Sequence, residues 1–321
     1  MTDPNVSFKW LTTFRVIAQS GSLQRAARIT GQSVSTVSLH LQQLETHLGA
    51  KLLDHSLRPM VLTAKGTVYL RYAEDVLDLL DRAQTDLKSN TSNTLSQLRF
   101  AMIDDFESDI GPDITRLLTT LLPACKFTLY TRDSHEILAM LRDRTVDIAI
   151  ATQPQSPLPK VREYPLLRDP FVLAVPAGGN CAPTDYIEDK SGLPFLRYMR
   201  SQIMGSMIEA QLNRLRISLE NSFELDSTTA IMSLIARGDG WAITTPSTFA
   251  RAKRFHGQVH LHPLPIKEFS RRISVFAVDP NLDDLTQTVQ TSLRTQLAAH
   301  TIGPIVEAYP WLADKYRLIP D

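Results

Sequence analysis

The chain is poor in the features that mark several large classes of protein. It has two cysteines among 321 residues, too few for a disulfide framework or a zinc site made of cysteines. The charge-free stretch Pro170–Thr184 contains three prolines and two glycines and is too short to cross a bilayer as a helix. The N-terminal segment has no basic stretch followed by an apolar run, so no secretory signal peptide is expected. These absences predict a cytoplasmic protein with no membrane partner.

The chain also lacks a net charge, since 34 Lys and Arg balance 34 Asp and Glu. The balance hides an uneven distribution. Residues 1–65 hold seven basic and three acidic side chains, a net charge of +4, whereas residues 66–89 hold three basic and five acidic ones, a net charge of −2. A basic segment followed by an acidic one predicts a polyanionic partner for the first segment only. Hydrophobic residues make up 43% of the chain, which excludes a disordered protein, and the length predicts about two domains.

Three helical patterns crowd into the first 50 residues. Apolar residues at helical spacing over 10–18 predict the first helix. Ser22 is placed to begin a short second helix over Leu23–Ile29. Ser33 is placed to begin a third helix, which ends at Gly49. The three helices are short enough to form one small domain.

A small hairpin is predicted after the third helix. Its apolar runs, Leu52–Leu53 and Met60–Leu62, flank a polar turn at Arg58–Pro59. Helix, short helix, glycine turn, capped helix and hairpin follow in the order of a winged helix-turn-helix domain, predicted over residues 1–65. The face of the third helix opposite Val37 is polar, as major-groove reading requires, although an ordinary solvated face carries the same residue types. Its outward residues are Ser35, Leu39, Gln42, Gln43 and Thr46.

A long fourth helix is predicted from Thr63 onward, within a linker over residues 66–95. Six apolar residues in it alternate at spacings of four and three, which is a heptad seam. The seam predicts either pairing with a second copy or an amphipathic helix lying on its own domain. We favour dimerisation, because the small preceding domain offers little surface to cover so long a stripe. The seam consists of Tyr69, Ala73, Val76, Leu80, Ala83 and Leu87.

After a polar hinge at Ser89–Ser96 the pattern changes to alternating strands and helices. This alternation predicts an α/β domain over 96–300 with mostly parallel sheets, whose ligand sites lie at the carboxyl ends of the strands. The expected strands are Leu98–Ile103, Phe127–Tyr130, Val146–Ala151, Phe171–Val175, Phe195–Tyr198, Trp241–Thr244 and Ile273–Val278. The expected helices are 110–122, 137–141, 204–215, 228–237 and 282–299.

Several short motifs in the first 66 residues follow one another in a specific order. The order is a Leu and a Phe in the first helix, Gly-Ser opening the second, paired Ala, a serine-rich entry to the third, and then Leu-Glu, Leu-Gly and Leu-Thr before a Gly. The residues at these positions are Leu11, Phe14, Gly21–Ser22, Ala26–Ala27, Ser33, Ser35, Val37–Ser38, Leu44–Glu45, Leu48–Gly49, Leu52–Leu53, Leu62–Thr63 and Gly66.

On these residues the chain resembles the LysR-type transcriptional regulators. A weaker resemblance at Leu141–Ile150 and Ile235–Pro246 extends it to about residues 8–300. The resemblance implies a regulator that binds double-stranded promoter DNA as a dimer or a dimer of dimers, with RNA polymerase as a further partner. It also implies a two-subdomain α/β effector domain, like a periplasmic solute-binding protein, with an unidentified small molecule in its cleft. Subdomain 1 would hold about 96–163 and 270–300, and subdomain 2 about 164–269, with crossing strands near Arg162–Arg168 and Pro265–Arg272.

Three positions depart from the family pattern. Val34 stands where the family often has Gln, and we expect it to pack rather than to meet a thymine methyl group. Leu39 and His55 each replace a common Arg, so we expect an unusual DNA sequence preference. Phosphate contacts are expected from Arg25, Arg28 and the hairpin, although both arginines could equally belong to a solvated helix face. The full set of expected DNA-binding residues is Ser22, Arg25, Arg28, Ser33, Ser35, Thr36, Ser38, Leu39, His40, Gln42, Gln43, Lys51, His55 and Arg58.

Polar residues at strand ends and helix starts of the α/β domain are the expected effector site. Hydroxyl groups and helix N-termini there suit a carboxylate, whereas Asp104 and Asp105 would repel one. Either Arg132, Arg197 or Arg200 offsets this repulsion, or the effector is neutral or cationic. The expected residues are Asp104, Asp105, Phe106, Ser134, Thr152, Gln153, Tyr198, Ser201, Ser227, Thr228, Thr244 and Thr245.

Other chemistry is thinly represented. The sequence has no phosphate-loop, dinucleotide-binding or HExxH motif, so we expect no enzyme activity, no cofactor and no metal. His256, His260 and His262 read as a solvated strand rather than as metal ligands, and Cys125 as a core thiol rather than as half of a redox switch. A solute-binding protein built on the same α/β halves is the alternative, and a signal peptide would favour it. Residues 301–321 form an extension with the apolar pattern of a docked helix.

Overall fold

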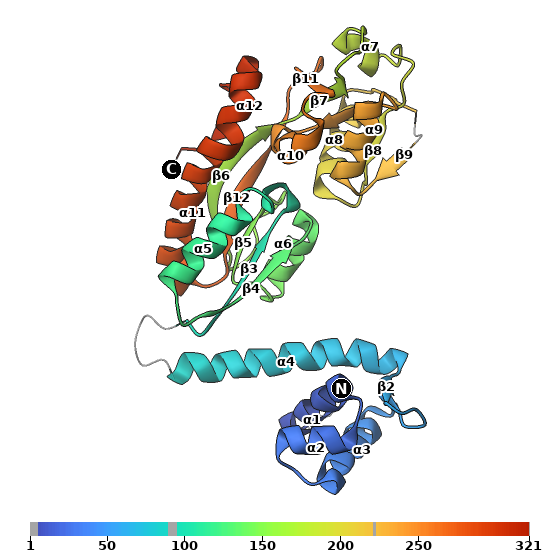
Figure 1. Ribbon diagram of the computed structural model, residues 1–321, viewed down its shortest axis with the longest axis vertical. Helices are drawn as coiled ribbons and strands as arrows, with labels where there is room; N and C mark the ends of the chain where they lie inside the picture. Colours follow the sequence, from blue (N-terminus) through green and yellow to red (C-terminus); the bar gives the residue numbers. More distant parts are fainter. Residues whose placement is uncertain (1–5, 89–94, 221–222, 321) are drawn as a thin grey trace. The chain divides into compact units, whose positions relative to one another are not determined.

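The computed structural model describes residues 6–88, 95–220 and 223–320, and the side chains at 78 and 81–88 also lie outside the described part. The predicted hinge therefore lies mostly outside it. The chain forms two compact units, Met1–Thr94 and Leu95–Asp321. Figure 1 draws the first in blue and cyan and the second in green to red.

The first unit begins with three helices whose ends follow the predicted local signals. They are α1 (Phe8–Ser20), α2 (Leu23–Thr30) and α3 (Val34–Leu48). Each starts after a serine whose hydroxyl oxygen accepts a backbone N–H of the first turn. Each ends at a glycine with φ between +61° and +67°, a left-handed conformation that residues with a Cβ rarely adopt. The predicted helix-turn-helix is confirmed.

The predicted hairpin and fourth helix are also present. Strands β1 (Leu53–Asp54) and β2 (Val61–Leu62) pair antiparallel. Helix α4 (Ala64–Lys88) follows, and Thr63 Oγ1 accepts the Gly66 N–H at 2.9 Å. A Cβ on Gly66 would lie 1.9 Å from the Leu52 carbonyl oxygen, so only glycine lets α4 approach the hairpin this closely.

We predicted that the heptad seam of α4 contacts a second copy of the chain. This prediction is wrong for the first two residues of the seam. The Tyr69 ring packs on Phe14 of α1 with centroids 6.0 Å apart, and Ala73 and Leu77 are buried in the core of the same unit. Spacing reveals an apolar face but not what covers it, and here α1 covers it. A second stripe on α4 remains exposed, and it consists of Val68, Tyr72, Val76 and Leu79. Leu80 is half-buried, and the side chains of Ala83 and Leu87 lie outside the described part.

The second unit is built on a six-stranded sheet with the order β13-β6-β12-β5-β3-β4. Parallel pairing links β5, β3 and β4, whereas β6, β12 and β13 pair antiparallel. The strands are β3 (Gln97–Met102), β4 (Lys126–Thr131), β5 (Ile148–Thr152), β6 (Arg162–Pro170), β12 (Ser270–Ala277) and β13 (Arg317–Leu318). Helices α5 (Gly111–Leu121) and α6 (Ser134–Arg142) connect the parallel strands, and α11 (Asp283–Leu297) lies along β6 and β12 (Figure 1).

The chain between β6 and β12 forms a second subdomain. Strands β6 and β12 lie side by side and lead into and out of it (Figure 1). They overlap the predicted crossing segments. The subdomain contains two small sheets, the antiparallel β10-β7-β11 and the parallel β8-β9. Its elements are β7 (Val172–Pro176), α7 (Pro183–Ile187), β8 (Leu196–Tyr198), α8 (Ile203–Arg214), β9 (Phe223–Leu225), α9 (Thr228–Arg237), β10 (Ala242–Thr244), α10 (Pro246–Arg251) and β11 (Val259–His262).

The prediction of mostly parallel sheets is wrong. Only strands joined through a helical crossover run parallel here, and the second subdomain is entered and left by strands that return directly beside one another. A strand pair that returns in this way is antiparallel. The predicted positions of strands and helices are otherwise confirmed to within a few residues.

The C-terminal extension docks as expected but contains more than a helix. A π-helical turn (Ala298–Ile302) and α12 (Gly303–Ala308) continue from α11. The chain then turns back and adds β13 to the free edge of β6. Leu312 and Tyr316 are fully buried in the core of the second unit. The extension is therefore an integral part of the sheet and not a tail.

Candidate functional sites

The outer face of α3 carries most of the expected DNA-reading side chains. Ser35, Ser38, Gln42 and Gln43 are exposed, and Leu39 has 51% of its surface accessible. Thr36 is half-buried. Val34 is 40% exposed, so its predicted packing is wrong, because the buried stripe of α3 begins only at Val37. An exposed valine at the start of this helix is available to a thymine methyl group.

Ser33 and His40, both expected to bind DNA, have structural partners within the unit. Ser33 Oγ lies 2.8 Å from both Ser35 Oγ and Thr36 Oγ1, and it also accepts the Thr36 N–H. His40 Nδ1 lies 3.1 Å from Thr13 Oγ1 and so joins α3 to α1. Arg25 and Arg28 are exposed on α2. The first turn of α3 is thus a connected hydroxyl cluster at the helix N-terminus.

Glu45 anchors the hairpin to α3. Its buried carboxylate accepts the backbone N–H groups of Leu52 and Leu53 at 2.8 and 3.3 Å. Lys51 Nζ and His55 Nε2 lie 2.8 and 3.2 Å from Glu45 Oε2. Burial raises the pKa of Glu45, but the hydrogen bonds from Lys51, the two amides and His55 outweigh it, so the pKa lies below its ordinary value. Lys51 and His55, which we expected to contact DNA phosphate groups, therefore also hold the hairpin in place.

The exposed Arg58 stands at the tip of the hairpin. Its Nη1 donates to the carbonyl oxygens of His55 and Leu57, each at 2.8 Å. These two bonds orient the side chain and leave the rest of the guanidinium group to solvent.

We expect Glu45→Gln to destabilise the first unit by about 1–3 kcal/mol, because it leaves buried hydrogen-bonding groups mismatched. A carboxyl group with a lowered folded-state pKa stabilises the fold above its unfolded-state value of about 4.3, and this stabilisation is lost as the pH falls through the folded-state pKa. The difference in stability between the wild type and the variant should therefore shrink below about pH 4. Urea unfolding of the variant and of a Thr46→Ala control, at pH 7 and in acid, measures it. A deficit that is unchanged in acid would contradict the role of the charge.

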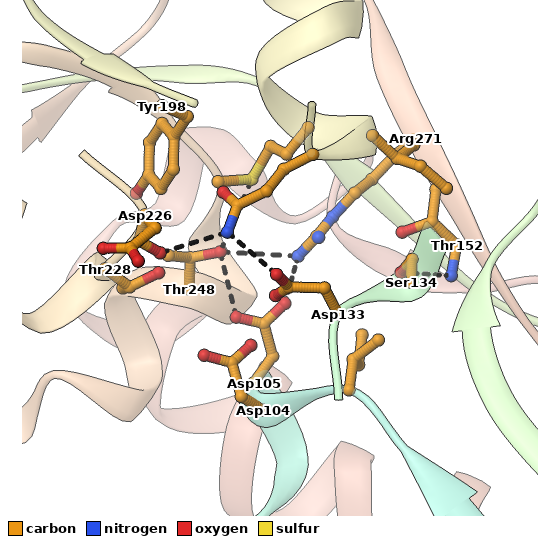
Figure 2. A pocket seen from close by; sticks show the side chains of 14 residues that line it. Asp104, Asp105, Asp133, Ser134, Thr152, Tyr198, Asp226, Thr228, Thr248 and Arg271 are labelled. Atoms are coloured by element: carbon orange, nitrogen blue, oxygen red, sulfur yellow. Dashed lines mark hydrogen bonds and ion pairs between the residues drawn. The ribbon is translucent and has the colours of Figure 1, made fainter. Parts of the chain in front are cut away.

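A cavity of about 40 Å³ lies between the two subdomains of the second unit (Figure 2). Strand ends and helix starts from both subdomains surround it, as the α/β pattern predicted. Six of the expected effector residues line it, namely Asp104, Asp105, Ser134, Thr152, Tyr198 and Thr228. The remaining lining residues were not anticipated, and they are Ile103, Asp133, Gln202, Ile203, Met204, Asp226, Thr248 and Arg271.

The other expected effector residues lie around the cavity or away from it. Thr244 Oγ1 lies 2.9 Å from the hydroxyl of Tyr198, which lines the cavity, and Thr245 Oγ1 accepts from Arg271 at 3.0 Å. Ser227 caps α9, and Gln153 lines a neighbouring larger cavity. Phe106 and Ser201 do not line the cavity. The apolar ring of Phe106 turns into the core, and Ser201 lies exposed before α8.

A buried ion cluster forms the floor of the cavity. Arg271 Nη2 on β12 lies 2.5 Å from Asp105 Oδ2 and 2.8 Å from Asp169 Oδ2. Thr248 Oγ1 donates to Asp105 Oδ1 at 3.1 Å. Burial opposes the charge on Arg271, but Asp105 and Asp169 outweigh it and raise the pKa of the guanidinium group. Asp105, Asp169 and Arg271 are all at most 8% exposed, so each charge depends on the others.

The arginines expected to offset Asp104 and Asp105 do not do so. Arg132 donates to the Thr131 carbonyl oxygen, Arg197 pairs with Glu209, and Arg200 pairs with Glu224 at 3.0 Å. Arg271 offsets Asp105 instead, and Arg251 pairs with Asp104. Arg271 was missed because it stands 166 positions from Asp105 in the sequence. Its one local signal was an arginine pair in a strand with no other charged residue.

The lining of the cavity keeps an excess of negative charge. Figure 2 shows Asp105 and Asp133 near the end of the Arg271 side chain, Asp104 beside Asp105, and Asp226 further away, near Thr228. Asp133 accepts from Gln202 Nε2 at 3.0 Å, a neutral donor. Burial raises the pKa of Asp104, and so does the nearby charge of Asp105, while Arg251 lowers it. The charge of Asp105 thus adds to burial in disfavouring the ionised form of Asp104.

Other candidate chemistry finds little support. His260 and His262 lie on β11 with ring centroids 4.7 Å apart. Within the described ranges, no group of three or more His, Cys, Asp or Glu side chains could hold a metal ion. Cys125 is only partly buried against the core, and burial raises the pKa of its thiol. Of the described helices, none is long and apolar enough to cross a membrane.

A winged helix-turn-helix unit joined to a two-subdomain α/β unit with a cavity between its subdomains defines a ligand-responsive DNA-binding protein. Comparison with known families agrees. Residues 8–67 match the bacterial regulatory helix-turn-helix proteins of the lysR family, and residues 93–296 match the LysR substrate binding domain. The chain belongs to the LysR family and is a DNA-binding transcriptional regulator with an effector-binding domain. The match over residues 8–67 favours this reading over a solute-binding protein.

Relatives and solved structures support the same assignment. The chain is 27% identical to the helix-turn-helix regulator YfeR of Shigella flexneri over 74% of this chain and 78% of that one. It is 25% identical to the regulator YofA of Bacillus subtilis over 79% of this chain and 86% of that one. Its fold matches OxyR of Corynebacterium glutamicum with bound hydrogen peroxide (TM-score 0.56, 19% identity, 95% and 96% of the chains). It also matches full-length CbnR in complex with its target DNA (TM-score 0.59, 18% identity, 90% and 99%).

Proposed function

We propose that this LysR-type regulator responds to a small cationic effector held in the acid-lined cavity and catalyses no reaction. The observation that carries the proposal is the charge of the lining. Of its four aspartates, Asp105 shares Arg271 with Asp169, and Asp104 pairs with Arg251. Among the described residues, Asp133 and Asp226 have no cationic partner. A volume of about 40 Å³ suits a group of a few heavy atoms, since one water needs about 10–15 Å³. An ammonium group fits both the charge and the size.

We further propose a cytoplasmic homodimer, or a dimer of dimers, that binds double-stranded promoter DNA and acts on RNA polymerase. In the first unit, Ser35, Thr36 and Leu39 lie nearest the N-terminus of the recognition helix and would read base edges, with Gln42 and Gln43 secondary. Arg58 would contact phosphate.

Base reading and phosphate contact predict different results for two alanine variants. Leu39→Ala should cost about 1–3 kcal/mol at one base-pair position and relax the preference there. Arg58→Ala should weaken all sites nearly equally and reduce the slope of log affinity against log salt by about one. Binding-site selection and salt titration on both variants measure this. The assignment fails if Arg58→Ala changes the selected sequence while Leu39→Ala leaves it unchanged.

The cationic effector predicts a charge-dependent stabilisation of the full-length protein. Methylammonium should raise the melting temperature, and acetate at equal ionic strength should not. Asp226→Asn should weaken methylammonium binding about tenfold or more, because it removes a charged acceptor, while Asp143→Asn at an exposed position should not. Thermal unfolding across a ligand titration measures both. Equal stabilisation by acetate, or an unaffected Asp226→Asn variant, would reject the cationic effector.

A further inference from the structure

A second and larger cavity of about 690 Å³ lies next to the acid-lined one and has the opposite character. The two share Thr152, Ile203 and Arg271 in their linings. Among the described residues that line the larger cavity there is no Asp or Glu. Three further arginines line it, Arg168, Arg272 and Arg317.

These three arginines form a row across adjacent strands. Arg168 on β6 is the register partner of Arg272 on β12 and also of Arg317 on β13. Register partners share one face of a sheet, with Cβ atoms about 4.5–5.5 Å apart, and like charges directly opposite each other are destabilising. We call this set the arginine row. An anion bound to the arginine row would relieve the repulsion between its like charges.

The arginine row has no acidic partner in the described part of the chain. Arg168 Nη1 donates to the Lys315 carbonyl oxygen at 2.7 Å, and Arg317 Nη1 lies 3.4 Å from the Leu318 carbonyl oxygen. Arg272 and Arg317 are exposed, so their guanidinium groups remain available to a ligand. The neighbouring Arg271 also borders this cavity, but its guanidinium group is paired with Asp105 and Asp169. Guanidinium forks match carboxylate and phosphate groups in bidentate geometry.

The rest of the wall defines the body of the ligand. Leu138 comes from α6, and Ile203 and Met207 come from α8, so both subdomains contribute. Ile319 and Pro320 close the cavity from the C-terminal extension. A volume of about 690 Å³ lies within the roughly 300–1,000 Å³ typical of small-molecule sites. The lining therefore suits an anion with an apolar body.

The C-terminal extension completes this cavity. Arg317, Ile319 and Pro320 all follow residue 296, where the match to the family's ligand-binding domain ends. The extension is firmly held, since the buried Tyr316 hydroxyl lies 3.0 Å from Ser247 Oγ. The Ile319 N–H donates to the Leu166 carbonyl oxygen at 3.0 Å. Arg317 is thus placed by a rigid strand and not by a loose terminus.

We propose that the arginine row and its apolar wall bind a small organic anion, a carboxylate or a phosphate, at a site separate from the acid-lined cavity. The anion bridges β6, β12 and β13 and, through Ile203 and Met207, also touches the second subdomain. Its binding therefore ties the C-terminal extension to the subdomain that faces the effector cavity.

The test uses calorimetric titration of the full-length protein with hexanoate, phenyl phosphate and inorganic phosphate. One anion should bind at one site per chain, and hexanoate against phenyl phosphate decides between carboxylate and phosphate. Weaker binding of inorganic phosphate than of phenyl phosphate shows the contribution of the apolar wall. Arg272→Gln and Arg317→Gln should each lose about tenfold or more in affinity, and Arg237→Gln, exposed on α9, should lose none. Binding should also weaken with salt.

Two further measurements separate this site from the effector cavity and from misfolding. Arg317→Gln should keep its methylammonium response, so that failure of either proposal can be recognised separately. Without ligand, Arg272→Gln and Arg317→Gln should melt at or above the wild-type temperature, because each removes a like-charge contact. Wild-type anion affinity in both variants, or failure of all three anions to bind the wild type, overturns the proposal.

Discussion

Arg271→Gln is expected to destabilise the second unit by about 3–5 kcal/mol, because it leaves Asp105 and Asp169 buried without their common counterion. The same substitution at Arg272, the exposed next residue on β12, should change stability by less than about 0.5 kcal/mol. Urea unfolding of both variants, followed by a probe of the second unit, measures the difference. Equal effects at the two positions would contradict the counterion role of Arg271.

The loss of stability caused by Arg271→Gln should depend on pH. Burial raises the pKa of Asp169 even with the guanidinium group beside it, and removing that group raises it further. A carboxyl group with a raised folded-state pKa binds more protons in the folded state, so folding gains stability as the pH falls. The deficit of the variant should therefore be larger at pH 8 than at pH 5. A deficit that grows towards pH 5 would mean that the two carboxylates do not carry the loss.

Charging the exposed stripe of α4 is expected to convert the protein to a monomer and to abolish tight promoter binding. Val68, Tyr72, Val76 and Leu79 are spaced by four, four and three residues and are each more than 40% exposed. A second copy would bury them, as the proposed dimer requires. Val76→Glu with Leu79→Glu places two charges in that contact. Losing the linkage between two DNA-binding units should lower DNA affinity about 10²–10⁴-fold.

Thr67→Glu is the matched control, because Thr67 is exposed on α4 away from the stripe. It should leave both the assembly and the DNA affinity unchanged. Sedimentation equilibrium and DNA titration of the two proteins decide the matter. An unchanged oligomer in the double variant would show that another surface holds the copies together.

Much of the DNA-binding unit could be predicted from the sequence, because its signals are local. A serine before each helix and a left-handed glycine after it act within a few residues, so the ends of α1, α2 and α3 follow from the chain itself. The polar outer face of α3 is equally local, since helical periodicity alone sets it. The order of these elements predicted a winged helix-turn-helix domain, and the motif residues between Leu11 and Gly66 gave the resemblance to the family.

Part of the lining of the acid-lined cavity was also predictable. Ser134, Thr152 and Tyr198 stand at the ends of strands or the starts of helices, and the α/β pattern brings such positions together. Phe106 stands next to the same strand end, but its ring is apolar and turns into the core. Position in an element was thus visible in the sequence, whereas the direction of the side chain was not.

Only the tertiary structure decided which charges meet and which apolar faces are covered. Arg271 finds Asp105 across 166 positions, and the arginine row exists only because β13 returns to the edge of β6. The apolar spacing along α4 is plain in the sequence, but α1 covers Tyr69 and Ala73 and leaves Val76 exposed. Caps and periodicity act through neighbouring residues, and so the sequence by itself determined the helices and strands, while its motif residues carried the resemblance to the family. Ion pairs and covered faces depend on strand order and packing between distant segments, and these arise only when the whole chain has folded.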